Sequence, residues 1–176
     1  MPCELAEKKV YKDVRSGNIE PYGITITVAG GQYLKLLQIV SGSCKRDDAD
    51  VLQLKTSKDD LLTDLLNSTN ERCVIFCKYT ASIDRVEALC KKAGKKVLVF
   101  DGRSKKSGKR PWELFDEGVG DILVAQYASG SAGLNIQSNC CVCIYWEPCL
   151  SALQLEQSSG RIYRSGQNRH CFYYYL

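Results

Sequence analysis

The strongest constraint on the fold is a regular alternation of short apolar runs and amphipathic helical patterns in the second half of the chain. Five apolar runs have the length and composition of β-strands: residues 73–77, 96–100, 122–125, 140–145 and 171–175. Helical patterns fit residues 82–93 and 110–117 between them. Strands that alternate with helices pair in parallel, because each crossover helix covers one face of the sheet. The sequence therefore predicts an α/β fold with a parallel sheet flanked by helices.

The first third of the chain carries a different pattern, which predicts a separate unit. Apolar residues at helical spacing recur in two segments before Gly42, a plausible helix terminator. The charged run 43–50 fits an exposed linker or a hairpin. Ser57, followed by acidic residues, favours the start of a helix that covers the sheet. We expect an N-terminal helical extension and linker at residues 1–56, and one α/β lobe at residues 57–176.

The composition is that of an ordinary globular protein, with 44% hydrophobic and 25% charged residues. No stretch approaches the ~20 apolar residues that a membrane span needs, and the polar N-terminus lacks the apolar segment of a signal peptide. We therefore expect an intracellular protein without a membrane partner. The net charge of +4 permits an anionic partner without requiring one.

Ten cysteines raise the alternatives of disulfides, a zinc site or buried small apolar side chains. Cys73 and Cys77 lie at the two ends of one predicted strand, and three more cysteines crowd the fourth strand. Among these three, Cys140 and Cys143 have no second pair at zinc-knuckle spacing, and the single His170 does not complete a zinc site. The spacing therefore favours buried apolar cysteines, and we expect no metal ligands.

Ligands of a parallel α/β sheet bind beyond the carboxyl ends of its strands, so the loops that follow the strands are the candidate functional segments. After the first strand, Lys78, Tyr79 and Thr80 precede a helix whose N-terminal amides could hold a phosphate. An ordinary capped turn fits these residues equally well. After the third strand, small residues from Ser129 to Gly133 let the backbone approach another surface closely, or form a tight turn.

The loop after the second strand holds the densest basic run of the chain. This segment comprises Gly102, Arg103, Lys105, Lys106, Lys109 and Arg110. We favour a patch for the nucleic-acid backbone over a simple solvated surface. The run is not a phosphate-binding P-loop, because five residues rather than four separate Gly102 from Gly108, and Arg110 stands where Ser or Thr must bind magnesium.

Two arginines near the C-terminus have the spacing of a phosphate site. Arg161 and Arg164 are three residues apart, so on a helix they project from one face, with Gln157 one turn earlier. Planar guanidinium groups suit a phosphate, while a solvated basic helix end is the alternative. The small-residue loop upstream favours the phosphate site.

Together these segments resemble motifs of the second RecA-like lobe in superfamily-two helicases, most closely the Swi/Snf-like DNA helicases and translocases. Residues 157–167 match the pattern Gln-x-x-Asp/Gly-Arg-x-x-Arg-x-Gly-Gln at every fixed place. Residues 133–135 match the most regular part of motif V in that family. Gly160 and Tyr163, in place of Asp and His, look more like the phage, viral and bacterial members than the chromatin remodellers.

The resemblance implies a DNA-dependent ATPase in which this lobe supplies arginines to the bound ATP. ATP and Mg²⁺ are then held mainly by a first lobe, which is absent from this sequence. It implies catalytic roles for Arg164 and Arg161, and nucleotide-binding roles for Gly133, Asn135, Gln157 and Gly160. The residues that it implies on the nucleic-acid backbone are Lys78, Tyr79, Thr80, Gly102, Arg103, Lys105, Lys106, Lys109, Arg110, Ser129, Gly130 and Ser131.

The partners implied by the resemblance are DNA, expected to be double-stranded, and the N-terminal RecA-like lobe of the same protein. The implied location is the cytoplasm, or the host cytoplasm or virion for a viral member. Two other functions stay open: a lobe of an RNA helicase, and a non-enzymatic adaptor that binds nucleic acid. The sequence contains neither a Walker A motif nor a Walker B strand, so this lobe alone is expected to be inactive.

Overall fold

The computed structural model describes residues 5–28, 30–104, 108–130 and 133–176. The chain divides into two compact units, which comprise residues 1–61 and 62–176. Among the described helices, none is both long enough and apolar enough to cross a membrane.

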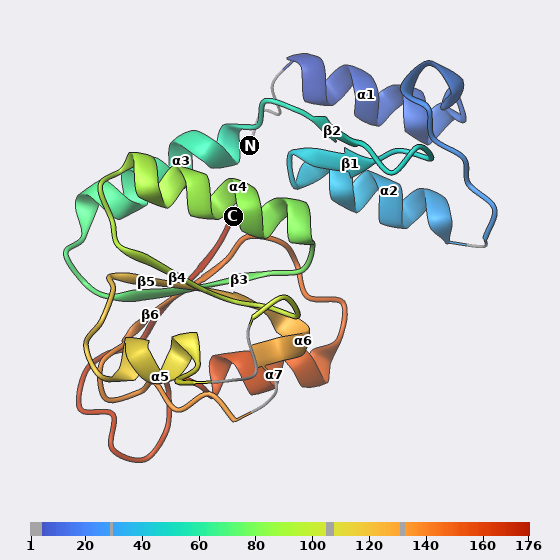
Figure 1. The fold of residues 1–176 in the computed structure, drawn as a ribbon. Helices are drawn as coiled ribbons and strands as arrows, with labels where there is room; N and C mark the ends of the chain where they lie inside the picture. The colour runs from blue at the N-terminus through green and yellow to red at the C-terminus, as the bar shows by residue number, and fades with distance from the viewer. Residues whose placement is uncertain (1–4, 29, 105–107, 131–132) are drawn as a thin grey trace. The chain divides into compact units, whose positions relative to one another are not determined.

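The first unit contains helices and a two-stranded hairpin (Figure 1). Its elements are α1 (Leu5–Ser16), the 3-10 helix η1 (Glu20–Tyr22), α2 (Gly31–Val40), β1 (Ser43–Lys45) and β2 (Val51–Gln53). Strands β1 and β2 pair antiparallel, with Ser43 opposite Gln53, so the charged run expected to be a linker or a hairpin forms the hairpin. Val14, Ile39 and Cys44 belong to the buried core of this unit.

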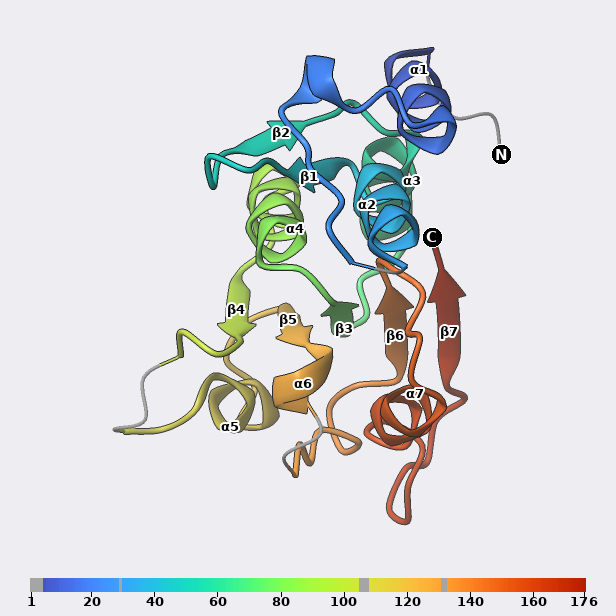
Figure 2. The same cartoon turned by 90° about the vertical axis from the view of Figure 1, so that its right-hand side faces the viewer.

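The second unit is built on a five-stranded sheet in which every pairing is parallel (Figures 1 and 2). Its strands are β3 (Cys73–Cys77), β4 (Val97–Phe100), β5 (Ile122–Gln126), β6 (Val142–Tyr145) and β7 (Phe172–Tyr175). Their spatial order is β4-β5-β3-β6-β7, which places β3 at the centre. The predicted parallel α/β fold is confirmed, and each apolar run predicted its strand to within two residues at either end.

Helices cover both faces of this sheet. They are α3 (Ser57–Ser68), α4 (Thr80–Lys92), α5 (Pro111–Asp116), α6 (Tyr127–Gly130) and α7 (Ala152–Ser159). Helices α3 and α4 lie on one face, and α5, α6 and α7 lie on the other (Figures 1 and 2). Leu62 of α3 and Ile83 of α4 belong to the first buried cluster, and Phe115 of α5 and Tyr127 of α6 to the second.

The central position of β3 explains why its sequence is uniformly apolar. All five of its side chains are buried. Ile75 packs with the helices on one face, while Val74 and Phe76 pack with those on the other. A strand buried on both faces needs an apolar side chain at every position. Each large side chain buried in this way contributes roughly 1.5–3 kcal/mol to stability.

The cysteines belong to this core. Seven of the nine described cysteines are buried, and Cys149 and Cys171 are partly exposed. Burial raises the pKa of Cys73, Cys90 and Cys140 to about 12, which keeps these thiols protonated at neutral pH. Among the described residues, no group of three His, Cys, Asp or Glu side chains is placed to hold a metal ion. The seven buried cysteines therefore act as small core residues, and five of them lie on the predicted strands.

We predict that the protein loses stability as the pH rises from 9 to 12. The folded protein keeps the Cys90 thiol protonated up to about 12, whereas the unfolded chain releases the proton near the ordinary pKa of 9.0. Unfolding therefore releases a proton in this window, and the free energy of unfolding falls by up to about 1.4 kcal/mol per pH unit for each such thiol. Denaturant titrations of the wild type and of Cys90→Val across this range measure the effect. Equal slopes for the two proteins would contradict it.

Candidate functional site

A buried carboxylate ties together the segments that leave the carboxyl ends of β3, β5 and β6. Glu147, two residues beyond β6, is 2% exposed, and its Oε2 accepts a hydrogen bond from the backbone N–H of Lys78 at 2.8 Å. The Tyr127 hydroxyl donates to the backbone oxygen of Glu147 at 2.8 Å, and Gln126 Nε2 donates to the backbone oxygen of Lys78 at 3.2 Å. The three segments are thereby fixed relative to one another. Sequence reasoning missed Glu147, because a single carboxylate before a proline has no distinctive pattern.

The segment after β3 places Lys78, Tyr79 and Thr80 at the start of a helix. Helix α4 begins at Thr80, and no side chain caps it at Tyr79. The first amides of a helix point outward and favour an anion. Lys78 Nζ lies 5.5 Å from the centroid of the Tyr79 ring, so the ammonium group and the helix start lie beside one another. Thr80 is exposed at the same place.

In the second loop, Arg103 is bound within the chain. Its Nε donates to Asp101 Oδ2 and its Nη2 donates to Asp84 Oδ1, both at 2.8 Å. The hydrogen bonds to Asp84 and Asp101 raise the pKa of Arg103 above its ordinary value. Asp84 belongs to α4, so this ion pair braces the loop after β4 against that helix. A phosphate at Arg103 has to compete with two carboxylates, whereas Gly102 is exposed with open space around it.

The other described cations of this loop are less constrained. Lys109 Nζ lies 2.7 Å from Glu117 Oε1, and each side chain is at least half exposed. An exposed pair of this kind contributes roughly 0–1 kcal/mol, so Lys109 can exchange Glu117 for a phosphate at little cost. Arg110 precedes α5, where its backbone N–H donates to the Glu113 carboxylate at 2.6 Å and its side chain is exposed. Lys105 and Lys106 lie outside the described residues.

The segment after β5 alternates between buried and exposed positions. Ser129 and Gly130 lie in the single helical turn of α6, and Ser131 lies outside the described residues. Leu134 and Ile136 are fully buried, so they anchor the segment to the core. Gly133 and Asn135 alternate with them and are exposed. Gly133 has a φ of 70°, a left-handed conformation that favours glycine.

The expectation that Arg161 and Arg164 project from one face of a helix is wrong. Helix α7 ends at Ser159, and residues 160–167 form a short stretch of turns and bends, named here the arginine turn. Glycine favours a helix end at position 160, and Ile162, fully buried, draws the chain into the core. Short-range hydrogen bonds then replace the helical pattern, for example from Gln167 N–H to Arg164 O at 3.0 Å. Only Gln157 of this predicted group lies on α7.

The arginine turn presents positive charge to solvent. Arg164 is exposed, and within the described residues its side chain forms no salt bridge with a carboxylate. Partial burial, and after it the charge of Arg164, lower the pKa of Arg161. Arg161 is thus partly buried and feels the positive charge of Arg164, which is itself exposed. An anion close to this turn would be attracted by both positive charges.

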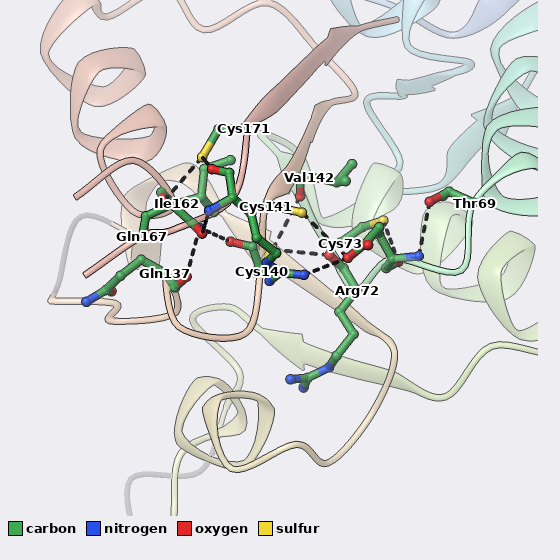
Figure 3. A network of polar contacts seen from close by, with 12 residues as sticks. Thr69, Arg72, Cys73, Gln137, Cys140, Cys141, Val142, Ile162, Gln167 and Cys171 are labelled. Carbon is green, nitrogen blue, oxygen red and sulfur yellow. Dashed lines mark hydrogen bonds and ion pairs between the residues drawn. The ribbon is translucent and has the colours of Figure 1, made fainter. Parts of the chain in front are cut away.

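The predicted site residues fall into two groups. Lys78, Tyr79, Thr80, the basic loop and Ser129 follow the carboxyl ends of β3, β4 and β5. The arginine turn lies elsewhere, because the Gln167 side chain binds it to the backbone at Gln137 and Cys140, just before β6 (Figure 3). Gln137 follows Asn135 by two residues, so the turn is connected to the segment that carries Gly133 and Asn135.

Solved structures share this fold. The crystal structure of the C-terminal part of the Fun30 ATPase domain matches with a TM-score of 0.62 and 22% identity, over 69% of this chain and 41% of that one. The S. cerevisiae Dbp5 C-terminal domain, solved with Gle1 and IP6, matches with a TM-score of 0.54 and 16% identity, over 68% of each chain. At these identities the likeness shows a RecA-like fold and no more.

Curated relatives match about two thirds of the chain. The DNA repair protein rhp54 of Schizosaccharomyces pombe is 27% identical over 65% of this chain and 14% of that protein. The uncharacterized ATP-dependent helicase YqhH of Bacillus subtilis is 31% identical over 68% and 21%, respectively. The DNA repair protein RAD5B of Arabidopsis thaliana is 27% identical over 60% and 8%. The matched part of the chain thus spans about a fifth or less of the length of each relative.

A family match covers both groups of site residues. Residues 57–166, which are more than half of the chain, match the helicase conserved C-terminal domain. This range contains the loops at the carboxyl ends of the strands together with Arg161 and Arg164. The chain therefore belongs to the family of helicase conserved C-terminal domains.

Proposed function

We propose that this chain is the second motor lobe of a Swi/Snf-like, DNA-dependent ATPase that acts as a helicase or translocase. The observation that carries the proposal is the arginine turn, in which Arg164 is exposed to solvent and forms no salt bridge among the described residues. Family membership and relatives described as DNA repair proteins and an ATP-dependent helicase support it. No observation specifically favours an RNA helicase lobe or a non-enzymatic adaptor.

In this proposal the arginine turn completes an ATP site whose other half lies on a first RecA-like lobe. ATP would supply the phosphoryl group that is transferred to water, and Mg²⁺ bound on the first lobe would neutralise charge on the phosphate oxygens. The residues of this chain fit that site, because Arg164 is exposed and its five donors can bind phosphate oxygens in pairs. Arg164 approaches the γ-phosphate, Arg161 assists, and Gln157, Gly160, Gly133 and Asn135 line the nucleotide side of the lobe.

The loops at the carboxyl ends of the strands are proposed to follow the backbone of double-stranded DNA. Glu147 holds the segments after β3 and β6 together, so they can move along a backbone as one body. Helix starts and lysines bind phosphates without reading bases, which suits a motor that moves on any sequence. Cycles of lobe closure over ATP would then shift these loops along the DNA.

We further propose that the parent enzyme belongs to the phage, viral or bacterial branch and acts in the cytoplasm, or in the host cytoplasm or virion. Gly160 and Tyr163 support this branch. Gly160 follows the last residue of α7, and Tyr163 is 74% exposed beside the two arginines. Sequencing the complete gene with its neighbours tests the assignment, because a chromosomal gene in a eukaryote would contradict it.

The isolated chain is predicted to hydrolyse no ATP, with or without DNA. It has no Walker A loop to hold the β- and γ-phosphates and no Walker B carboxylate for magnesium. A steady-state phosphate-release assay at high protein concentration measures this. Hydrolysis that survives repurification and disappears in Arg164→Ala would show that the chain holds a complete site.

Binding of the chain to duplex DNA is predicted to be weak, independent of sequence and dependent on salt. Each neutralised phosphate contributes about −0.9 to the log-log slope, so three to four contacts give roughly −3. Charge reversal of Lys105 and Lys106 should remove about two phosphate contacts and so reduce the magnitude of this slope by about 1.8. Fluorescence anisotropy at several salt concentrations measures the slopes. The matched control reverses Lys91 and Lys92, at the opposite end of α4 from Lys78, and equal effects of the two pairs would contradict the patch.

In an enzyme that carries both lobes, Arg164→Lys is predicted to lower kcat by roughly 10²- to 10³-fold. Lysine keeps the charge but lacks the paired donors, so an interaction made in the transition state is lost. The KM for ATP and the affinity for DNA should change much less. Arg161→Lys should lower kcat by a comparable or smaller factor.

Ser165→Ala is the matched control for this experiment, because Ser165 is exposed in the same turn. Ser158 is unsuitable, because its buried hydroxyl lies 3.2 Å from the Tyr145 hydroxyl and contributes to the fold. An Arg164→Lys enzyme that melts at a lower temperature but turns over ATP at the normal rate would rule out the arginine-finger role.

A further inference from the structure

The side chain of Gln167 uses both ends of its amide to hold the arginine turn. Its Nε2 donates to the backbone oxygens of Gln137 at 2.8 Å, Cys140 at 2.9 Å and Ile162 at 3.1 Å (Figure 3). Its Oε1 accepts a hydrogen bond from the backbone N–H of Arg169 at 3.0 Å. One side chain thus binds the turn and the segment that leads into β6.

The hydrogen bonds of Gln167 fix the backbone next to the two arginines. Ile162 lies between Arg161 and Arg164 in the chain, and its backbone oxygen is one of the three acceptors. Gln137 closes the segment that begins at Gly133. The amide therefore joins the middle of the arginine turn to the end of the segment after β5.

We propose that Gln167 is a positioning residue that fixes Arg161 and Arg164 for the reaction and couples them to the segment carrying Gly133 and Asn135. The proposal rests on the proposed function, since it assigns Gln167 a role in presenting those arginines to a phosphate. Both ends of the Gln167 amide are occupied by backbone groups, so its role is to position the arginines.

Other contacts hold the ends of the turn, and at its centre the Cys171 thiol, a weak donor, donates to the backbone oxygen of Ile162 at 3.5 Å. Before the turn, the Tyr173 hydroxyl donates to Ser159 O at 2.9 Å. After it, Arg169 forms an ion pair with Glu71 at 2.7 Å. Between these points the buried Ile162 side chain fixes one residue, and the Gln167 amide fixes the backbone around it. Loss of the amide would leave the ends in place and loosen the backbone between Arg161 and Arg164.

The chemistry of the site requires an amide. Three carbonyl oxygens converge on Nε2, so they need a donor, and a carboxylate at this place would meet them with negative charge. Gln167→Glu keeps the shape but meets the carbonyl oxygens with a carboxylate. Gln167→Met keeps the length but removes the donor to the Gln137 and Cys140 oxygens, while the Ile162 oxygen keeps only the Cys171 thiol. Asn168→Ala is the matched control, because Asn168 carries the same amide group one residue later on an exposed position.

The first experiment measures backbone hydrogen exchange in the 176-residue chain. Exchange at residues 161–167 should become roughly tenfold faster in Gln167→Met and Gln167→Glu, and should not change in Asn168→Ala. The helices on the other face of the sheet, α3 and α4, should exchange at the normal rate. Unchanged exchange in the turn of both Gln167 variants would overturn the proposal without touching the proposed function.

The second experiment is a double-mutant cycle in an enzyme that carries both lobes. Gln167→Met should lower kcat by about a hundredfold, because misplacing a catalytic group by ~1 Å costs that much. In an Arg164→Lys background the same change should add little, because the lost positioning acts through Arg164. A purely structural role predicts a lower melting temperature and multiplicative effects on kcat.

The outcomes separate the two hypotheses. If Arg164→Lys lowers kcat and Gln167→Met does not, the positioning role is wrong and the motor function stands. If Arg164→Lys leaves kcat unchanged, the arginine-finger function fails, whatever Gln167 does. If Gln167→Glu does not fold, hydrogen exchange and kcat are both measured on Gln167→Met, which introduces no charge.

Discussion

The candidate site depends on the parallel register of β3 with its two neighbours. Cys73 lies opposite Ile122 of β5 and Val142 of β6, so the three strands run level with one another. This alignment brings the Lys78 amide to the Glu147 carboxylate across the end of the sheet. A slip of one residue would turn every side chain of β3 to the wrong face and break that bond. The position of the loops is thus a consequence of how the core packs.

Most of the fold could be predicted from sequence because its signals are local. An apolar run such as Cys73–Cys77 identifies a buried strand without knowledge of its neighbours. The end of α7 could not be predicted in this way, because the apolar spacing continues through Ile162 while the chain leaves the helix at Gly160. Gln167, which holds that departure, binds backbone oxygens up to 30 residues away. No local pattern carries such a contact.

Local sequence also does not show whether a charged side chain is paired within the chain. Sequence assigned Arg103 and Arg164 to phosphate contacts on their residue type and position. The structure gives Arg103 two carboxylate partners, one of them the buried Asp101, whereas Arg164 is exposed. A count of basic residues therefore overstates the positive charge that the loop after β4 can offer to DNA. The groups that fold against an arginine decide whether it braces the chain or faces a ligand.

An arginine that acts on a phosphate held by another domain has two opposing requirements. It must reach beyond its own fold, which favours an exposed turn over a packed helix. It must also start from a fixed point, because an unrestrained side chain loses entropy when it binds. The arginine turn meets both, since Arg164 is exposed while Ile162 and Gln167 hold the backbone on either side of it. Helix α7 ends earlier than the sequence predicts, and this early end allows Arg164 to be exposed on a backbone that is held in place.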